Sequence, residues 1–342
     1  MNAGKQELAT VANHWLARFE AALRARDAAR LGSLFHVDSH WRDVLALTWR
    51  IRTESGAAAL VPALLEAGAE ARGFGVDPDR TAPRHVTRAE TKCVEALFRF
   101  ETAQGQCNGV LRLRSEDGSD PKAWTLLTAL EEIKGHEERT GRLRPTGQAY
   151  SRDFSGPNWL DGRKAAAAYG DRDPAVLVVG GGQAGLSIGA RLTQRGIDTL
   201  VVDRWARVGD NWRQRYHALT LHNQVHVNHL PYMPFPANWP LYIPKDKLAN
   251  WFEAYAEAME LNYWTASEFL GGTYDEASGR WTVTVDHQGE KRVMHPRHVV
   301  MATGVSGIPN VPDIPALRNF RGQVIHASQY AHAAPWKAKR VL

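Results

Sequence analysis

The sequence predicts two parts, an α+β domain followed by an α/β domain built on a parallel sheet. Three observations lead to this prediction. The length of 342 residues exceeds the ~150 residues of a typical single domain. In the first half, helical periodicity is followed by long strand-like stretches, an order typical of α+β domains. In the second half, a continuous apolar strand runs into a glycine-rich turn and a helix, as in parallel α/β folds.

The composition is that of an ordinary globular protein, with 44% hydrophobic and 23% charged residues. Residues 1–20 contain no apolar core of a signal peptide, and no apolar run approaches the ~20 residues needed to cross a bilayer. The two cysteines, Cys93 and Cys107, form no C-x-x-C pair and have no histidine at zinc spacing. We therefore expect reduced thiols in a cytoplasmic protein that has no membrane partner.

The net charge of +5 raises the question of a nucleic-acid ligand. The arginines are spread along the chain with acidic residues between them, and no helix-turn-helix, RNP or zinc-finger pattern occurs. A mild basic bias also suits phosphate-bearing cofactors. We therefore expect no nucleic-acid partner.

The first domain is predicted over residues 1–140. Residues 7–27 place apolar side chains at helical spacing, and Asp27 can cap a second short helix that runs through Phe35. Strands are predicted from their β-branched and apolar content, with breaks at Gly105 and at an Asp117-Gly118 turn. They cover residues 44–52, 91–101, 107–114 and 123–133.

His36, Asp38, His40 and Asp43 resemble a metal cluster, because alternate residues of a strand share one face. The segment, however, reads as a connection between a helix and a strand, and no further ligand spacing supports a site. We predict no metal here.

Residues 141–173 are rich in Gly, Pro, Arg and Asp and are predicted to be a linker, with a short Ala-rich stretch at 165–168. The second domain is predicted over residues 174–342. It opens with an apolar strand, a glycine loop, a helix, a turn at Gly196 and a second strand.

The glycine loop carries the pattern Gly180-x-Gly182-x-x-Gly185. The first glycine allows a tight turn, the second lets a pyrophosphate approach the backbone, and the third lets helix and strand pack closely. The helix N-terminus then offers free N–H groups to the phosphates, and a carboxylate after the second strand can accept ribose hydroxyls. The predicted cofactor-binding residues in this unit are Gly180, Gly182, Gln183, Ala184, Gly185, Asp203 and Arg204. The pattern alone does not separate FAD from NAD.

Later motifs make that separation. The Gly209-Asp210-Asn211-Trp212 segment is followed by a Leu-x-Leu-His block at 219–222 and a Pro-Phe-Pro block at 234–236. An Ala302-Thr303-Gly304 stretch then precedes an F-x-G-x-x-x-H-x-x-x-Y pattern that spans 320–330. These motifs resemble the class B flavin-dependent monooxygenases, a group of flavin-containing N- and S-oxygenases, plant indole-pyruvate monooxygenases and Baeyer–Villiger enzymes. Asp210 stands where that family has a second glycine, and the blocks at 219–222 and 234–236 are most similar to the plant type.

The resemblance covers residues 170–342 and implies an FAD-binding, Rossmann-like two-dinucleotide-binding fold. In such an enzyme, NADPH reduces FAD, O₂ forms a flavin C4a-hydroperoxide, and one oxygen atom passes to a nitrogen, sulfur or carbonyl centre of a small organic substrate. An N,N-dimethylaniline monooxygenase-like activity is implied. Further cofactor-binding residues follow from the motifs: Asn211, Trp212, His222, Ala302, Thr303 and Gly304. Catalytic candidates are Asn223 and His326, although His326 also fits a gating role and Trp212 also fits core packing.

The element order of the first half and the stretch LFHVDSHWRDVLALTWRIRT resemble the cone-shaped fold of ketosteroid isomerase, polyketide cyclases and nuclear transport factor 2. This resemblance implies a ligand pocket, a dehydratase-like site or a dimer interface, and it allows a homodimer through this domain.

Residues 339–342, Lys-Arg-Val-Leu, read as the start of a strand. In the family that strand leads to a second glycine loop for NADPH, so we expect an incomplete fold that lacks a proper NADPH site. A disulfide reductase is rejected because both cysteines precede residue 110. The remaining alternative is a non-catalytic cone domain, which binds a ligand or dimerises, fused to an inactive flavoprotein fragment.

Overall fold

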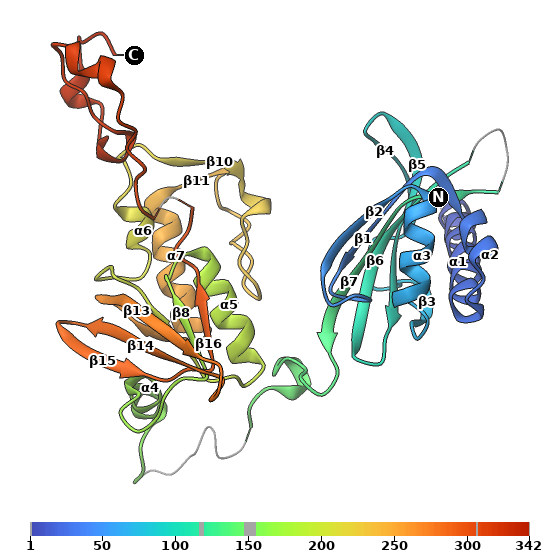
Figure 1. The fold of residues 1–342 in the computed structure, drawn as a ribbon, viewed down its shortest axis with the longest axis horizontal. Coiled ribbons are helices and arrows are strands. Elements are labelled where there is room, and N and C mark those ends of the chain that lie inside the picture. The colour runs from blue at the N-terminus through green and yellow to red at the C-terminus, as the bar shows by residue number, and fades with distance from the viewer. Residues whose placement is uncertain (1, 116–119, 147–154, 306, 342) are drawn as a thin grey trace. The chain divides into compact units, whose positions relative to one another are not determined.

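The computed structural model of the chain describes residues 2–115, 120–146, 155–305 and 307–341. It divides into two compact units, residues 1–137 and residues 138–342 (Figure 1). The predicted Asp117-Gly118 turn lies outside the described residues.

The first unit packs helices on one face of a seven-stranded sheet (Figure 1). The strand order is β2-β1-β7-β6-β5-β3, with β4 also paired to β5, and only β1 and β7 run parallel to each other. The buried core between sheet and helices combines leucine and alanine side chains with large aromatic ones, including Trp15, Phe19, Trp41 and Phe98. The helices are α1 (Asn2–Ala25), α2 (Ala28–Ser33) and α3 (Ala57–Ala67); the strands are β1 (Phe35–Val44), β2 (Ile51–Ser55), β3 (Arg72–Val76), β4 (Arg84–Arg88), β5 (Thr91–Glu101), β6 (Gly105–Arg114) and β7 (Lys122–Ile133).

The strand predicted over 44–52 is wrong. The chain instead ends β1 at Val44, turns over residues 45–50 and begins β2 at Ile51. The fully buried Asp43 carboxylate causes the turn, because it accepts hydrogen bonds from the Leu47 and Thr48 amides and from the Thr48 hydroxyl. Thr128 of β7 donates a further hydrogen bond of 2.6 Å to Asp43. The other three predicted strands are confirmed, as is the Asp27 cap of α2, although α2 ends at Ser33 and Phe35 already belongs to β1.

The histidine-rich run lies within β1 and is not a connection between a helix and a strand. His36 contacts Asp38, and His40 is hydrogen-bonded to the Ser55 hydroxyl. Asp43 is buried toward the helices, whereas Asp38 and His40 are exposed. Among the residues that the structure describes, no group of three His, Cys, Asp or Glu side chains is arranged to hold a metal. Cys93 and Cys107 are both buried and unbonded to each other.

The second unit is built on a four-stranded parallel sheet in the order β12-β9-β8-β16. Its two central strands, β8 and β9, are buried along their whole length, as expected for parallel strands covered on both faces. The predicted α/β Rossmann-like fold is therefore confirmed. The elements are β8 (Val176–Val179), α5 (Gln183–Gln194), β9 (Thr199–Val202), β12 (Asn262–Trp264) and β16 (His298–Met301).

Three smaller parts surround this sheet. The ribbon of β10 and β11 packs on helix α7, which in turn contacts α5, and an antiparallel three-stranded sheet joins β12 to β16 (Figure 1). They comprise α6 (Asp210–Arg213), β10 (Thr220–Gln224), β11 (Tyr242–Pro244), α7 (Lys245–Ala258), β13 (Ser267–Asp275), β14 (Arg280–His287) and β15 (Glu290–Met294). Short 3₁₀ helices occur at Gly141–Leu143, Val225–Val227, Pro315–Asn319, Ala327–Gln329 and Ala334–Trp336. No helix in the described part of the chain is long and apolar enough to span a membrane.

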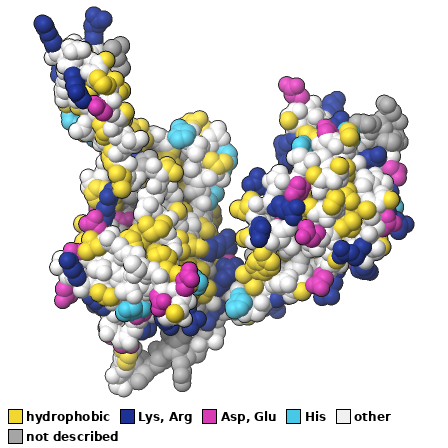
Figure 2. All heavy atoms as spheres, in the orientation of Figure 1, with side chains coloured by type: hydrophobic (Ala, Val, Ile, Leu, Met, Phe, Trp, Pro, Cys, Tyr) yellow, Lys and Arg dark blue, Asp and Glu magenta, His cyan; other side chains and the backbone are white. Residues whose placement is uncertain are grey.

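The last segment, 305–341, has no strands among its described residues and exposes a series of apolar side chains (Figure 2). They are Val305, Ile308, Val311, Ile314, Leu317, Phe320, Val324, Tyr330 and Val341. The segment is held near Tyr216, whose ring lies 5.8 Å from that of Tyr330, and the His217 amide donates to the Ala331 carbonyl.

Part of the predicted linker forms helix α4 (Trp159–Ala168), which packs on the parallel sheet. The Trp264 indole donates to the Ala167 carbonyl, and Arg163 donates to Asn262 of β12. Immediately after α4, the buried Tyr169 hydroxyl donates to Asp198 at 2.7 Å. Residues 159–169 are thus an integral part of the second unit.

Candidate functional site

The glycine loop lies at the carboxyl end of β8, between β9 on one side and β16 on the other. Since the chain leaves β8 toward β9 and returns to the opposite side of β8 as β16, this is a topological switch point, where open α/β sheets bind ligands. Gly180 adopts a positive φ of 101°, a conformation that favours glycine. The predicted tight turn is therefore present.

Helix α5 begins directly after this loop. Its N-cap residue, Gly182, makes no side-chain capping bond, and Gln183 and Ala184 in the first turn are exposed. The first amide groups of a helix have no partner within the helix, and they lie at the positive end of its dipole. This end of α5 can therefore receive phosphate oxygens.

Separate parts of the chain enclose the loop. A Cβ atom added at Gly180 would lie 2.5 Å from the Ala302 carbonyl oxygen, and one at Gly182 would lie 3.1 Å from the Asn211 side-chain nitrogen. At Gly185 an added Cβ would lie 1.9 Å from the loop's own Gly180 oxygen. The structure thus brings the glycine loop, the 209–212 segment and the 302–304 stretch together, as their motifs imply.

Asp203 follows β9 and holds the same loop. Its carboxylate accepts a hydrogen bond of 2.6 Å from the Gly181 amide and one of 2.9 Å from the Trp205 amide. Each carboxylate oxygen has two lone pairs, so capacity remains for ribose hydroxyls. The exposed Arg204 lies over the Trp205 ring and reaches the Gly307 carbonyl at 3.4 Å.

Asn211 and Trp212 lie on helix α6, and α6 packs against α7. The Cα of Gly209 approaches the Ala249 backbone so closely that an added Cβ would lie 2.4 Å from the Ala249 carbonyl oxygen. The ammonium group of the buried Lys245 donates to the Arg213 carbonyl at 2.9 Å. α6 is therefore fixed against the buried face of α7.

Two polar atoms of α6 are buried without a hydrogen-bond partner among the described residues: the Asn211 Oδ1 and the Trp212 Nε1. Buried polar groups in folded proteins are nearly always paired. A dinucleotide with ribose and phosphate groups supplies both donors and acceptors. The donor set, the uncapped helix end and the glycine cradle therefore fit FAD.

The remaining predicted residues lie in more open places. Thr303 and Gly304 follow β16, and His222 and Asn223 are exposed on β10. The His326 Nδ1 is hydrogen-bonded to Ser328 at 2.8 Å, at the start of a 3₁₀ helix. None of the hydrogen bonds found between described residues joins Asn223 or His326 to the glycine loop, so their catalytic role remains a prediction.

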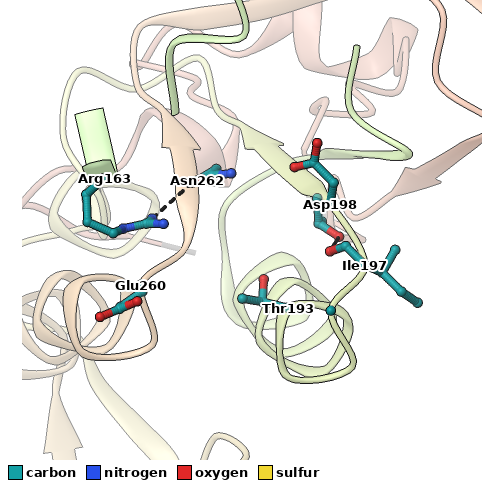
Figure 3. Close-up of a pocket in the computed structure, with 8 residues that line it drawn as sticks. Arg163, Thr193, Ile197, Asp198, Glu260 and Asn262 are labelled. Atoms are coloured by element: carbon teal, nitrogen blue, oxygen red, sulfur yellow. Dashed lines mark hydrogen bonds between the residues drawn. The ribbon is translucent and has the colours of Figure 1, made fainter. Parts of the chain in front are cut away.

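A separate cavity of about 170 Å³ lies at the amino ends of β9 and β12, the sheet edge opposite to the glycine loop (Figure 3). Arg163 points into it toward Asn262, with Glu260 and Thr193 on neighbouring walls. Its polar groups take part in fastening α4 to the sheet, since Trp159 donates to Glu260 and Arg163 to Asn262.

The sequence motifs did not point to Gly181, Tyr263 or Lys245 as parts of this site. Tyr263 and Lys245 are far from the loop in the sequence and belong to no glycine pattern. Apolar periodicity only places them on a strand and a helix.

Taken together, the switch-point loop, the uncapped helix and the terminal acid define a dinucleotide-binding α/β protein. Residues 173–342 match the family described as flavin-binding monooxygenase-like. The second half of the chain belongs to this family, in agreement with the predicted class B flavin monooxygenase.

Curated relatives show the same relationship. The chain is 35% identical over 170 residues to indole-3-pyruvate monooxygenase YUCCA1 of Oryza sativa subsp. japonica, covering 49% of this chain and 41% of the relative. It is 32% identical over 170 residues to the probable indole-3-pyruvate monooxygenase YUCCA4 of Arabidopsis thaliana, covering 49% and 40%. The chain thus spans about two fifths of the length of these relatives. Among solved structures, a flavin-containing monooxygenase from Stenotrophomonas maltophilia matches with a TM-score of 0.43 and 25% identity, covering 48% of each chain.

Proposed function

We propose that the second unit binds FAD at the glycine loop and serves an NADPH-dependent monooxygenase. The observation that carries this proposal is the convergence of the 209–212 and 302–304 segments on the glycine loop, together with the uncapped start of α5 and the unpaired polar atoms of Asn211 and Trp212. Bound FAD would take electrons from NADPH and deliver one oxygen atom of O₂ to a nitrogen, sulfur or carbonyl centre of a small organic substrate.

In this proposal the protein binds and orients the cofactor. The N-terminal amides of α5 hold the pyrophosphate, Asp203 accepts hydrogen bonds from the ribose, and Asn211 and Trp212 offer their unpaired polar atoms. α6, held on α7, limits the access of water to the flavin. No side chain needs to act as a nucleophile.

For the first unit we propose the cone-shaped fold and a homodimer through it. The support is its curved sheet, covered by helices on one face only (Figure 1). The second candidate function is a non-catalytic ligand-binding or dimerising domain joined to an inactive flavoprotein part. The packed aromatic rings in the core of this unit favour its dimerising form, because they occupy space that a ligand pocket would need.

The test of the FAD proposal is the visible spectrum of the purified chain, followed by release and identification of the flavin. We expect absorption near the wavelengths of oxidised flavin and release of FAD. Gly185→Ala should abolish this absorption, because the added methyl would lie 1.9 Å from the Gly180 oxygen. Gly162→Ala is the matched control, since its methyl meets nothing within 4 Å.

A folded chain that binds no FAD, even when FAD is added, would contradict the proposal and favour the second candidate function. If FAD is bound, bleaching by NADPH under anaerobic conditions tests the monooxygenase part. A flavin that NADPH does not reduce would restrict the proposal to FAD binding.

A further inference from the structure

The Tyr263 side chain, from strand β12, packs against Gly181, the residue between the first two glycines of the motif. A Cβ atom added at Gly181 would lie 1.7 Å from the Tyr263 hydroxyl oxygen, 2.3 Å from its Cζ and 2.6 Å from its Cε2. Carbon atoms in contact normally lie ~3.5–4.0 Å apart. No side chain fits at residue 181 while Tyr263 stays in place.

The reason is space and not backbone conformation. Gly181 is not among the glycines with positive φ, whereas Gly180 and Gly196 are. A positive φ therefore does not explain the glycine at position 181. The three atoms nearest to an added Cβ all belong to Tyr263, so this side chain accounts for the demand for glycine.

Tyr263 is held firmly against the loop. It lies in β12, where it pairs with Val201 of β9, and its ring packs against two clusters of buried apolar residues. Burial raises the pKa of its hydroxyl, and the charges of Asp203 and Asp210 raise the pKa further. The hydroxyl therefore remains protonated and neutral beside two carboxylates.

Asp203 also constrains the position of Gly181. Its carboxylate accepts the Gly181 amide at 2.6 Å, which fixes the peptide plane, while Tyr263 limits the position of the Gly181 Cα. The next residue, Gly182, is the N-cap of α5, and the second glycine of the motif is where a pyrophosphate approaches the backbone. A shift of residue 181 would therefore also move the amides at the start of α5, which are the proposed phosphate-binding groups.

We propose that Tyr263 is a positioning residue of the cofactor loop, which sets the height of Gly181 above the sheet and makes glycine obligatory at that position. This inference rests on the proposed FAD site and adds to it a residue from outside the motifs. It assigns to β12 a role in cofactor binding through packing rather than through contact with the cofactor.

The test is a double-mutant cycle in the full chain, with FAD affinity measured by quenching of flavin fluorescence. Gly181→Ala should weaken FAD binding by about tenfold or more, because the added methyl overlaps Tyr263 and must displace the loop. Tyr263→Val removes the hydroxyl and ring yet keeps a residue suited to a strand. Gly181→Ala combined with Tyr263→Val should regain affinity to within about threefold of Tyr263→Val alone.

Tyr263→Phe keeps the ring but removes the 3.4 Å hydrogen bond that the Tyr263 hydroxyl donates to the Gly181 carbonyl, so it separates packing from hydrogen bonding. The phenyl carbons would still lie 2.3 and 2.6 Å from the added Cβ, so Gly181→Ala combined with Tyr263→Phe should remain as weak as Gly181→Ala. Gly162→Ala is the control for a glycine-to-alanine change that meets no neighbour. Wild-type affinity of Gly181→Ala, or no recovery with Tyr263→Val, would overturn the proposal.

The melting temperature of the cofactor-free chain gives a second readout. Gly181→Ala should lower it when Tyr263 is present and have less effect in the Tyr263→Val background. If the wild-type chain binds no FAD, the proposed function fails. The melting cycle then still decides whether Tyr263 excludes a side chain at 181, and additive effects would refute that pairing.

Discussion

Glu95 illustrates how single residues determine the behaviour of the first unit. It lies on β5 with 7% of its surface exposed, and Arg84, Arg88 and Arg112 all donate to its carboxylate. Burial disfavours the charged form, but the hydrogen bonds from these arginines outweigh it and lower the pKa of Glu95 to about 2. The cluster joins β4, β5 and β6.

A pH dependence follows from this. A folded-state pKa below the ordinary value of 4.5 means that the stabilisation is complete above pH ~4.5 and is lost as the pH falls toward ~2. Glu95→Gln should lower the free energy of unfolding by roughly 1–3 kcal/mol at pH 7. It should also flatten the decline of the melting temperature between about pH 5 and pH 3. Parallel melting curves of wild type and Glu95→Gln across this range would contradict the assignment.

At the scale of elements, α4 shows how a segment predicted to be a linker forms part of a domain. Its start carries a capping box, in which Asn158 accepts the Asp161 amide at 3.0 Å and Asp161 accepts the Asn158 amide at 3.1 Å. Its end is fixed by the Trp264 indole. The start of α4 thus depends on two neighbouring residues, whereas its end depends on Trp264 of β12.

The cap can be tested directly. Asn158→Ala should lower the stability of the second unit by about 0.5–2 kcal/mol, since an unpaired helix end replaces a satisfied one. Asn158→Asp, which keeps an acceptor, is the matched control. Thermal unfolding measures the loss, and limited proteolysis should show faster cleavage within 159–168. Equal stability of both variants and wild type would mean that α4 does not contribute to the fold.

At the scale of the whole molecule, each unit has its own hydrophobic core. The core of the first unit lies between residues 12 and 126, and the cores of the second lie between 169 and 294. Separate cores allow separate unfolding transitions. Sequence-distant contacts within each core make each transition cooperative.

FAD should therefore stabilise one transition only. A ligand at 100 times its dissociation constant adds about 2.7 kcal/mol to the unit that binds it. Calorimetry with and without FAD should show one transition that moves to higher temperature and one that does not. A shift of both transitions by the same amount would contradict an FAD site confined to the second unit.

Local pattern was sufficient for much of the fold. The strand predicted over 91–101 coincides with β5, the Asp27 cap forms, and the glycine loop lies between a buried strand and a helix. Each of these features depends on neighbouring residues, through alternation, a capping side chain or a turn that needs glycine. The same locality explains why the loop and the two segments around it could be listed from their motifs.

Other features depended on partners far away in the sequence. The turn at 45–50 requires Thr128 to complete the bonding of Asp43, α4 requires Trp264, and Gly181 is constrained by Tyr263. Such contacts arise only when strands and helices pack, because side-chain distances across a core are not encoded in the spacing of residues. The sequence by itself determined the class of fold and the cofactor loop. The tertiary structure alone decided which distant side chains shape that loop.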